Sequence, residues 1–245
     1  MGTPIKPYSD SDKGKKEQVA GMFNNIAGKY DFLNHFLSLN IDKLWRRKVI
    51  RMLQAKQPEF ILDVATGTGD LAIAALKCKP KRVDGIDISE GMLEVGKKKI
   101  QQKGHENTIF LTLGDAENIP FDDNTFDAIT VAFGVRNFEN LDKGLSEMLR
   151  VLKPNGICAV LEFTMPKTFP TKQLYGVYFK YVLPAFGKMI SKDNSAYTYL
   201  PESVKAFPQG VDFLKHMQLI GFRKTNYKSL TMGIAAIYVG EKNQI

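Results

Sequence analysis

A segment of the chain with the sequence ILDVATGTGDL combines two glycines with residues that can bind polar groups. Gly67 and Gly69 lack a Cβ atom, so the backbone there can turn tightly and approach a ligand closely. Thr68 lies between them, and Asp63 and Asp70 flank the pair. Because glycine loops between a strand and a helix are typical of nucleotide-binding α/β proteins, we predict that this segment binds a cofactor.

Two further acids stand where later strands are expected to end. Asp87 comes twenty residues after Gly67, a spacing that suits a carboxylate accepting hydrogen bonds from two ribose hydroxyls, and Ile88 follows it directly. Asp115 comes after the next expected strand, where it and Ala116 would hold an adenine edge through a carboxylate and a backbone amide. We therefore predict that these four residues bind the nucleoside part of the cofactor.

Charge separates two classes of cofactor. The pattern Gly67-x-Gly69-x-x-Ala72 also fits the looser dinucleotide fingerprint, but a pyrophosphate prefers a helix N-terminus without acids, and Asp63 and Asp70 would repel it. S-adenosyl-L-methionine carries a sulfonium and an ammonium against one carboxylate, so neighbouring acids stabilise it. We predict S-adenosylmethionine, with a nicotinamide or flavin dinucleotide as the alternative. A strand-end acid and a helix cap would explain the two acids singly but not their convergence.

Strands and helices alternate along the segment that carries these residues. We predict strands at 60–64, 83–88, 109–113, 126–132 and 157–163, and helices at 70–77, 90–103 and 141–152. Such alternation implies a parallel, doubly wound sheet. A helix at 203–219 stopped by Gly221, then strands at 223–227 and 234–241, would complete it with an antiparallel hairpin. The predicted fold is α/β, a mostly parallel, seven-stranded, Rossmann-like sheet of the class I methyltransferase type.

Helices are also expected outside the sheet. Apolar residues spaced three or four apart lie on one face of residues 19–52, namely Met22, Phe23, Ile26, Tyr30, Leu33 and Phe36. We predict two or three short helices in a helical preface at 18–56, with Asp42 as a possible N-cap. The helix after Asp42 carries a basic stripe of Arg46, Arg47, Lys48 and Arg51. Residues 1–17 are predicted to be a flexible N-terminus, and 18–245 one methyltransferase domain.

Composition limits the remaining possibilities. The 245 residues, 44% hydrophobic and 24% charged, suit one globular domain. Neither a secretory signal nor a membrane span is evident, so we expect a cytoplasmic protein. Cys78 and Cys158 are far apart and have no nearby histidine cluster, so no metal site is predicted. The net charge of +8 leaves two partners open, a nucleic acid and an anionic membrane surface.

Motifs along most of the chain carry a closer resemblance. They are FNNIAGKYDFLN at 23–34, DKLWRR at 42–47, GDAENIPF at 114–121, FGVRN at 133–137 and EMLRVLKPNGI at 147–157. Together with the glycine loop, they make the chain similar to the ubiquinone/menaquinone-biosynthesis C-methyltransferase family from about Gln18 to the C-terminus. The resemblance implies that S-adenosylmethionine methylates a prenylated demethylquinol, and that the product is menaquinol or a ubiquinol precursor.

Methylation of a quinol ring carbon requires one hydroxyl to be deprotonated or strongly hydrogen-bonded, so that the ring carbon becomes a nucleophile. A hydroxyl pKa of about 10 needs only one acceptor, or a water that it polarises. The predicted catalytic residues are Arg136, Asn137, Tyr30 and Asp31, and candidate acceptors are Asp31, His35 and Glu162. Arg136 would stabilise the quinolate. A loop salt bridge for Arg136, a turn role for Asn137, and simple packing of Tyr30 and Asp31 stay open.

The connection at 166–202 is longer than a strand-to-helix link needs, and we predict a helical lid insertion there. Residues 163–192 hold five lysines and no acid. The aromatic residues among them are Phe169, Tyr175, Tyr178, Phe179, Tyr181 and Phe186. A basic, aromatic-rich segment can lie on an anionic lipid surface, so we predict an entrance for the isoprenoid tail and peripheral membrane contact through 166–192. A packed helical cap with snorkelling lysines is the alternative.

Three functions remain open on the sequence. We predict methylation of demethylmenaquinol, with the benzoquinol precursor of ubiquinone as the alternative acceptor. A basic RNA methyltransferase would fit the charge but lacks a base-stacking motif beside the site, so no nucleic-acid partner is predicted. A module that binds S-adenosylmethionine and only scaffolds a biosynthetic complex is the third. The oligomeric state is open.

Overall fold

The computed structural model describes residues 5–8, 11–182 and 195–244. Three residues named above fall outside this description: Phe186 entirely, and Leu33 and Phe36 in their side chains. Within the described part, no helix combines the length and the apolar character needed to cross a bilayer.

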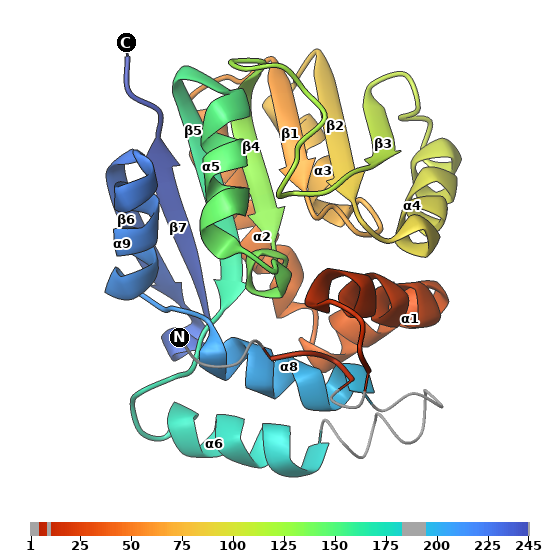
Figure 1. The fold of residues 1–245 in the computed structure, drawn as a ribbon, viewed down its shortest axis with the longest axis vertical. Helices are drawn as coiled ribbons and strands as arrows, with labels where there is room; N and C mark the ends of the chain where they lie inside the picture. The colour runs from red at the N-terminus through yellow and green to blue at the C-terminus, as the bar shows by residue number, and fades with distance from the viewer. Residues whose placement is uncertain (1–4, 9–10, 183–194, 245) are drawn as a thin grey trace.

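One seven-stranded sheet, in the order β3-β2-β1-β4-β5-β7-β6, forms the centre of the protein (Figure 1). Its strands are β1 (Phe60–Val64), β2 (Arg82–Asp87), β3 (Ile109–Leu113), β4 (Phe126–Ala132), β5 (Leu152–Phe163), β6 (Arg223–Leu230) and β7 (Ala235–Glu241). Strands β1 to β5 pair in parallel, whereas β7 runs antiparallel to both β5 and β6. The predicted doubly wound sheet and its antiparallel C-terminal hairpin are confirmed, with β7 inserted between β5 and the edge strand β6.

Helices cover both faces of the sheet. They are α1 (Lys15–Leu37), α2 (Ile41–Gln54), α3 (Asp70–Ala75), α4 (Glu90–Gln102), α5 (Leu141–Val151), α6 (Thr171–Val177), α8 (Ser195–Ala206) and α9 (Val211–Ile220). One apolar core packs α2, α3 and α4 on one face, and a second packs α5 and α9 on the other. Because both faces of the central strands are covered, those strands are almost continuously apolar.

Short helical turns complete the described chain. They are the 3₁₀ turns Leu76–Cys78, Val135–Asn137 and Thr231–Gly233, and the π-helical segment Tyr178–Val182 after α6. Helices α1, α6 and α8 gather at one end of the sheet, at the bottom of Figure 1. Residues of α1 line cavities there together with residues that follow β1, β2 and β4. The described parts of the insertion are helical from Thr171 onward, which confirms the predicted helical insertion after the fifth strand.

The N-terminal helices differ from the prediction in two ways. Helix α1 is continuous over 23 residues and begins at Lys15, inside the segment predicted to be flexible. The reason is a long-range contact, since the ammonium of Lys15 donates to the carbonyls of Arg136 at 3.0 Å and Phe138 at 2.7 Å. Asp42 is not the N-cap of α2, because Asn40 takes that place with a left-handed φ of 60° and Asp42 lies buried in the first turn.

The predicted helix at 203–219 is two helices. Helix α8 ends at Ala206 and α9 begins at Val211. Pro208 has no N–H to continue the first helix, and Gly210 has a φ of 62°, so the chain turns between them. The predicted stop at Gly221 is confirmed, since this residue caps α9 with a φ of 118°.

Two glycines in helices provide a matched test of the packing. A Cβ on Gly96 of α4 would lie 2.6 Å from Leu111 Cδ1 and 3.2 Å from the carbonyl oxygen of Thr68, in the glycine loop. A Cβ on Gly28, exposed on α1, would meet nothing within 4 Å. We expect Gly96→Ala to lower the free energy of unfolding by about 1–3 kcal/mol. Gly28→Ala should raise it by roughly 0.5–1 kcal/mol. Urea denaturation measures both, and equal effects would contradict this packing.

Candidate active site

Three adjoining cavities meet where α1 crosses the carboxyl ends of the strands. All three share the side chains of Tyr30, from α1, and Phe133, from the segment after β4. The first cavity contains most of the predicted nucleoside-binding residues, the second contains acids of the glycine loop, and the third is large and apolar. The sheet thus brings together residues that are far apart in the sequence.

The first cavity is lined by four residues predicted to hold the nucleoside: Asp87, Ile88, Asp115 and Ala116. One oxygen of Asp87 accepts the backbone N–H of Gly67 at 2.8 Å, and the other accepts that of Ser89 at 2.8 Å. Desolvation raises the pKa of the Asp87 carboxyl to about 6, although these backbone donors oppose the shift. The carboxylate is fixed at the glycine loop while it stays open to the cavity.

Lys16 of α1 closes the far side of this cavity. Its ammonium lies 2.6 Å from one oxygen of Asp115 and 3.4 Å from Glu117. The opposite wall requires a glycine, because Gly67 has a φ of +56° and a Cβ there would lie 3.2 Å from the end of Met92. A group in this cavity can therefore approach the backbone of Gly67 closely.

The second cavity centres on the carboxylate of Asp63, at the end of β1. This group is buried and accepts the hydroxyls of Thr66 at 2.6 Å and Thr130 at 2.7 Å. Burial raises the pKa of Asp63 to about 6, and the hydroxyls and the charge of Arg46 only partly oppose it. Thr68 and Asp70 also line this cavity. A cationic group would be stabilised here more than a neutral one.

Unlike Gly67, Gly69 does not face a cavity. It lines none of the three cavities and stands at the N-terminus of α3 with a φ of 79°. Its left-handed backbone lets the loop turn into the helix. Its contribution to cofactor binding therefore stays a prediction and would be indirect.

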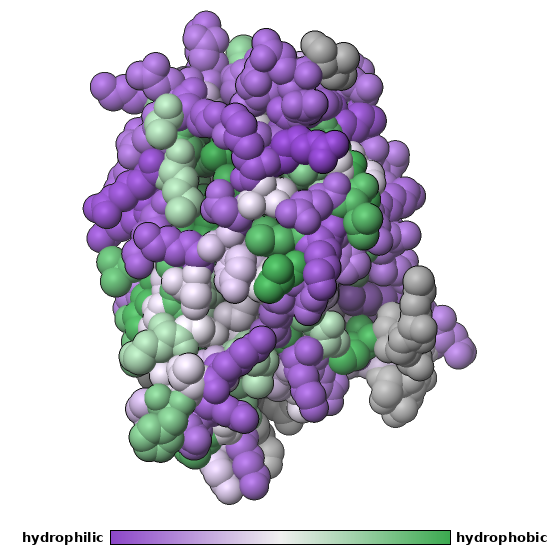
Figure 2. All heavy atoms as spheres, turned by 90° about the vertical axis from the view of Figure 1, so that its left-hand side faces the viewer, coloured by the Kyte–Doolittle hydropathy of each residue, from purple (hydrophilic) through white to green (hydrophobic). Residues whose placement is uncertain are grey.

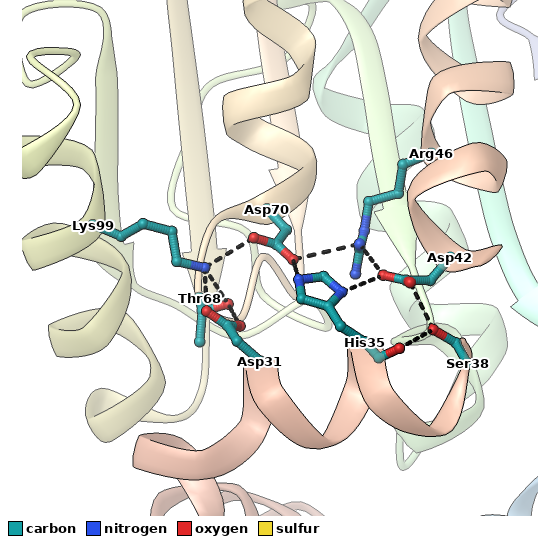
Figure 3. Close-up of polar contacts among 8 residues, drawn as sticks. All are labelled: Asp31, His35, Ser38, Asp42, Arg46, Thr68, Asp70 and Lys99. Atoms are coloured by element: carbon teal, nitrogen blue, oxygen red, sulfur yellow. Dashed lines mark hydrogen bonds and ion pairs between the residues drawn. The ribbon is translucent and has the colours of Figure 1, made fainter. Parts of the chain in front are cut away.

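An ionic network joins α1, α2 and α4 to the glycine loop (Figure 3). One oxygen of Asp70 lies 3.4 Å from both Arg46 and His35, and the other lies 2.9 Å from Lys99. Lys99 also lies 2.5 Å from Asp31. Each acid of the network thus meets a cationic or hydrogen-bonding partner from a different element, and α1 is held against the loop.

Arg46 and Asp42 form the buried part of this network. Their side chains are 8% and 0% exposed and lie 2.5 Å apart. Burial raises the pKa of Asp42, but the hydrogen bond from Ser38 and the charges of Arg46 and His35 outweigh it and hold that pKa below its ordinary value. His35, Asp42 and Asp70 are close enough to share a metal ion. The guanidinium of Arg46, however, is already paired with both aspartates and supplies the positive charge.

Two predicted residues do not reach the cavities. The carboxylate of Asp31 accepts the hydroxyl of Thr68 at 2.5 Å and pairs with Lys99, and it lines none of the three cavities. His35 is bound to Asp42 at 2.8 Å and lines none of them either. The structure therefore does not bring either side chain to where a ring hydroxyl would bind, and gives no support to a role as proton acceptor.

The third cavity has a volume of about 490 Å³ and is lined mainly by apolar side chains of α1, α6 and α8 and by Trp45 and Phe163. Arg136 contributes to its wall.

One guanidinium nitrogen of Arg136 lies 2.8 Å from the fully buried Glu162 and also donates to the carbonyl of Phe133. Burial raises the pKa of Glu162, while Arg136 lowers it. Asn137 lines the first cavity instead, so Tyr30, Arg136 and Asn137 stand around the junction.

Several site residues were missed in the sequence. Lys16 lies in a polar run that carries no motif, and Lys99 is one of three consecutive lysines on α4. Arg46 was assigned to a basic stripe with Arg47, Lys48 and Arg51, yet it is buried, whereas Arg47 and Lys48 beside it are exposed. Helical spacing carried a weak signal, since Arg46 follows Asp42 by four residues and can pair with it.

The sequence profile of the ubiE/COQ5 methyltransferase family matches residues 11–242. The chain belongs to this family. It is 52% identical over 239 residues to a demethylmenaquinone methyltransferase of Bacteroides fragilis, with 97% of each chain covered. It is 46% identical over 240 residues to a demethylmenaquinone methyltransferase of Porphyromonas gingivalis, with 97% of this chain and 98% of the relative covered. It is 43% identical over 240 residues to a ubiquinone/menaquinone biosynthesis C-methyltransferase of Geobacter sulfurreducens, with 97% of this chain and 93% of the relative covered.

Solved structures share the fold of this methyltransferase. One is an S-adenosylmethionine-dependent methyltransferase of Thermotoga maritima, described as a possible histamine N-methyltransferase. It superposes with a TM-score of 0.64 at 18% sequence identity, and the match covers 92% of this chain and 100% of that one. A second, an S-adenosylmethionine-dependent methyltransferase of Methanococcus maripaludis, superposes with a TM-score of 0.59 at 20% sequence identity. This match covers 97% of this chain and 98% of that one. The predicted class I methyltransferase fold is confirmed.

The buried ion pair of the methyltransferase gives a stability prediction. Arg46→Met would leave the carboxylate of Asp42 buried without its closest cation, so we expect the free energy of unfolding at pH 7 to fall by about 3–5 kcal/mol. Arg47→Met, an exposed neighbour, should change it by less than about 0.5 kcal/mol. Urea denaturation measures both.

The same pair sets a pH dependence. Because the pKa of Asp42 is lowered in the folded protein, its stabilisation is present above about pH 4 and is lost as the pH falls further. The difference between Arg46→Met and the wild type should therefore shrink in acid. A difference that is constant from pH 7 down to pH 3 would show that lost packing, and not the ion pair, is responsible.

Proposed function

We propose that this methyltransferase transfers the methyl group of S-adenosylmethionine to a ring carbon of demethylmenaquinol, giving menaquinol. The observation that carries the proposal is the junction of the three cavities at Tyr30 and Phe133. On one side stand acids suited to a cationic nucleoside, and on the other a cavity of about 490 Å³ suited to an apolar ring and the start of its isoprenoid tail. The names of the relatives from Bacteroides fragilis and Porphyromonas gingivalis agree with this substrate.

The cofactor would be held in the first two cavities. When bound, S-adenosylmethionine supplies an electrophilic methyl group on a positively charged sulfur. Asp87 would accept the ribose hydroxyls, and Asp115 and Ala116 would bind the adenine edge. Asp63 and Thr68 would face the amino-acid end, where the buried carboxylate stabilises an ammonium.

Arg136 is proposed to activate the quinol. Its guanidinium, held by Glu162 at 2.8 Å, would place a fixed positive charge beside one ring hydroxyl. A positive charge in an apolar cavity lowers the pKa of a neighbouring hydroxyl and stabilises the quinolate that forms. The hydroxyl proton would pass to a water beside the ion pair, since Asp31 and His35 are engaged in the ionic network. Asn137 and Tyr30 would orient the reacting groups at the junction.

The benzoquinol precursor of ubiquinone is a second candidate acceptor. The name of the relative from Geobacter sulfurreducens covers both quinones. A benzoquinol has the same pair of ring oxygens and a similar tail, so the apolar third cavity does not discriminate strongly between the two rings. RNA is disfavoured, because the lining of this cavity is mainly apolar.

The test is a transfer assay with S-adenosylmethionine labelled on its methyl group. The purified protein is incubated with demethylmenaquinol, with the demethylated benzoquinol, or with total RNA, and each is analysed for label. We expect label in demethylmenaquinol. Arg136→Met should lower its kcat by about 100-fold or more, as for the loss of other stabilising charges, whereas Arg47→Met should leave it unchanged. Labelling of RNA alone, or of nothing, would contradict the proposal.

We propose further that the mouth of the third cavity contacts a membrane. Three exposed apolar side chains, Leu39, Leu174 and Met232, line this cavity. The segment 167–181, which contains α6 of the cavity wall, also exposes Phe169, Val177 and Tyr181 and three lysines, Lys167, Lys172 and Lys180. Figure 2 shows apolar side chains interspersed on the lower half of one face, toward α6, while hydrophilic side chains dominate its upper half. Apolar side chains ringed by lysines suit an anionic lipid surface, from which a prenylated substrate would enter.

Sedimentation with anionic vesicles tests this contact. Replacing Lys167, Lys172 and Lys180 together by Gln should weaken vesicle binding about 100-fold, since each lysine near the surface contributes about 1 kcal/mol. The matched control replaces Lys97, Lys98 and Lys103, which are exposed on and just after α4 and carry the same total charge. If the control weakens binding as much as the test variant, net charge and not this surface is responsible.

A further inference from the structure

Within the described part of the chain, four polar side-chain atoms in the wall of the third cavity are buried and have no hydrogen-bond partner. They are Asn34 Nδ2, Arg136 Nε, and the hydroxyls of Tyr175 and Tyr199. They come from four separate elements, α1, the turn after β4, α6 and α8. A buried polar group without a hydrogen-bond partner lowers stability, so four such atoms around one cavity destabilise the free protein.

Three other hydroxyl side chains of this wall have hydrogen-bond partners within the protein. Ser38 donates to Asp42 at 2.6 Å, Thr171 lies 3.5 Å from the sulfur of Met232, and Thr231 accepts the indole N–H of Trp45 at 2.8 Å. The four unpaired atoms differ in this respect from these three hydroxyls. They suit a ligand with an apolar body and a small number of oxygens.

The two tyrosines differ from Arg136 in charge. Burial raises the pKa of Tyr199 to about 12, and it raises the pKa of Tyr175 as well, although the charge of Arg136 opposes both shifts. Both hydroxyls thus stay neutral at physiological pH and can donate or accept a hydrogen bond. The cavity therefore offers the oxygens of a quinol two kinds of hydrogen-bond partner, the cationic guanidinium of Arg136 and the neutral hydroxyls of Tyr175 and Tyr199.

That difference matters for the ring chemistry. The carbon to be methylated is adjacent to one hydroxyl-bearing carbon, and negative charge on that oxygen raises the electron density at this carbon. Negative charge on the opposite oxygen would instead raise the electron density at the carbon that bears the isoprenoid tail. Catalysis therefore requires the adjacent oxygen to face the cation and the opposite oxygen to stay protonated.

We propose that Tyr175 and Tyr199 are positioning residues that hydrogen-bond the quinol oxygen remote from Arg136, and so select the ring carbon that faces the methyl donor. This inference rests on the proposed function and extends it to the insertion, which thus supplies polar recognition as well as cover. Asn34 adds a donor from the α1 side of the same cavity.

The test uses Tyr175→Phe and Tyr199→Phe, which remove only the hydroxyls. Each should lower kcat/KM for demethylmenaquinol at least tenfold, mainly through KM, and leave the KM for S-adenosylmethionine unchanged. Each should also leave the free protein at least as stable as the wild type in urea, because an unpaired buried hydroxyl is lost. A merely structural role would not combine unimpaired stability with impaired quinol binding. Tyr227→Phe, at a tyrosine of the edge strand β6 that is 42% exposed and lines none of the three cavities, is the control and should change nothing.

The possible failures can be told apart. An active wild type whose two variants keep the wild-type kcat/KM would overturn the positioning role and leave the proposed function standing. A wild type that transfers no methyl group to demethylmenaquinol would overturn the proposed function, and this inference with it. Loss of stability in both variants, to the same degree as the loss of activity, would show that the hydroxyls serve folding instead.

Discussion

Two carboxylates at the carboxyl ends of adjacent strands are held without an ion-pair partner, and the site is organised around them. Asp63 is enclosed at the end of β1, and Asp87 faces the first cavity at the end of β2; within the described part of the chain, their partners are hydroxyls and backbone N–H groups. Desolvation raises the pKa of each to about 6, which records the cost of keeping them charged there. A cationic ligand offsets that cost, whereas a pyrophosphate would add to it.

Helix α1 relates this acid site to the rest of the molecule. One side of the helix is bound to the glycine loop and to α4 through Asp31, His35 and Lys99, as Figure 3 shows. Another side carries Tyr30 into all three cavities. Because the same helix closes the cofactor site and forms a wall of the apolar cavity, the methyl donor and the ring that accepts the methyl group are brought to one junction. The helices of the insertion complete the wall around the acceptor.

Local patterns in the sequence were sufficient to predict much of this fold. The bounds of β1, β3 and β4 were predicted to the residue, because each is a short apolar run between turn signals. Only β1 and β4 are buried on both faces, whereas the edge strand β3 is partly exposed. Long-range contacts were not predictable in the same way. The start of α1 at Lys15 depends on carbonyls more than 120 residues away. The burial of Arg46 depends on Asp70 of α3 as well as on Asp42 of its own helix. Asp31 follows Tyr30 directly, but consecutive helical residues point about 100° apart, so only one of the two faces the cavities.

The central claim is that Asp63 and Asp87, which form no ion pair within the described part of the chain, define a site for a cation. Calorimetric titration with S-adenosylmethionine at pH 6, in buffers of different ionisation enthalpy, tests it most directly. Each acid is about half protonated at that pH, and a bound cation favours the charged form, so up to about one proton should be released per cofactor bound. Release should be much smaller at pH 8, and Asp63→Asn should reduce it at pH 6. A binding enthalpy that is the same in every buffer at pH 6, or proton uptake, would contradict the account.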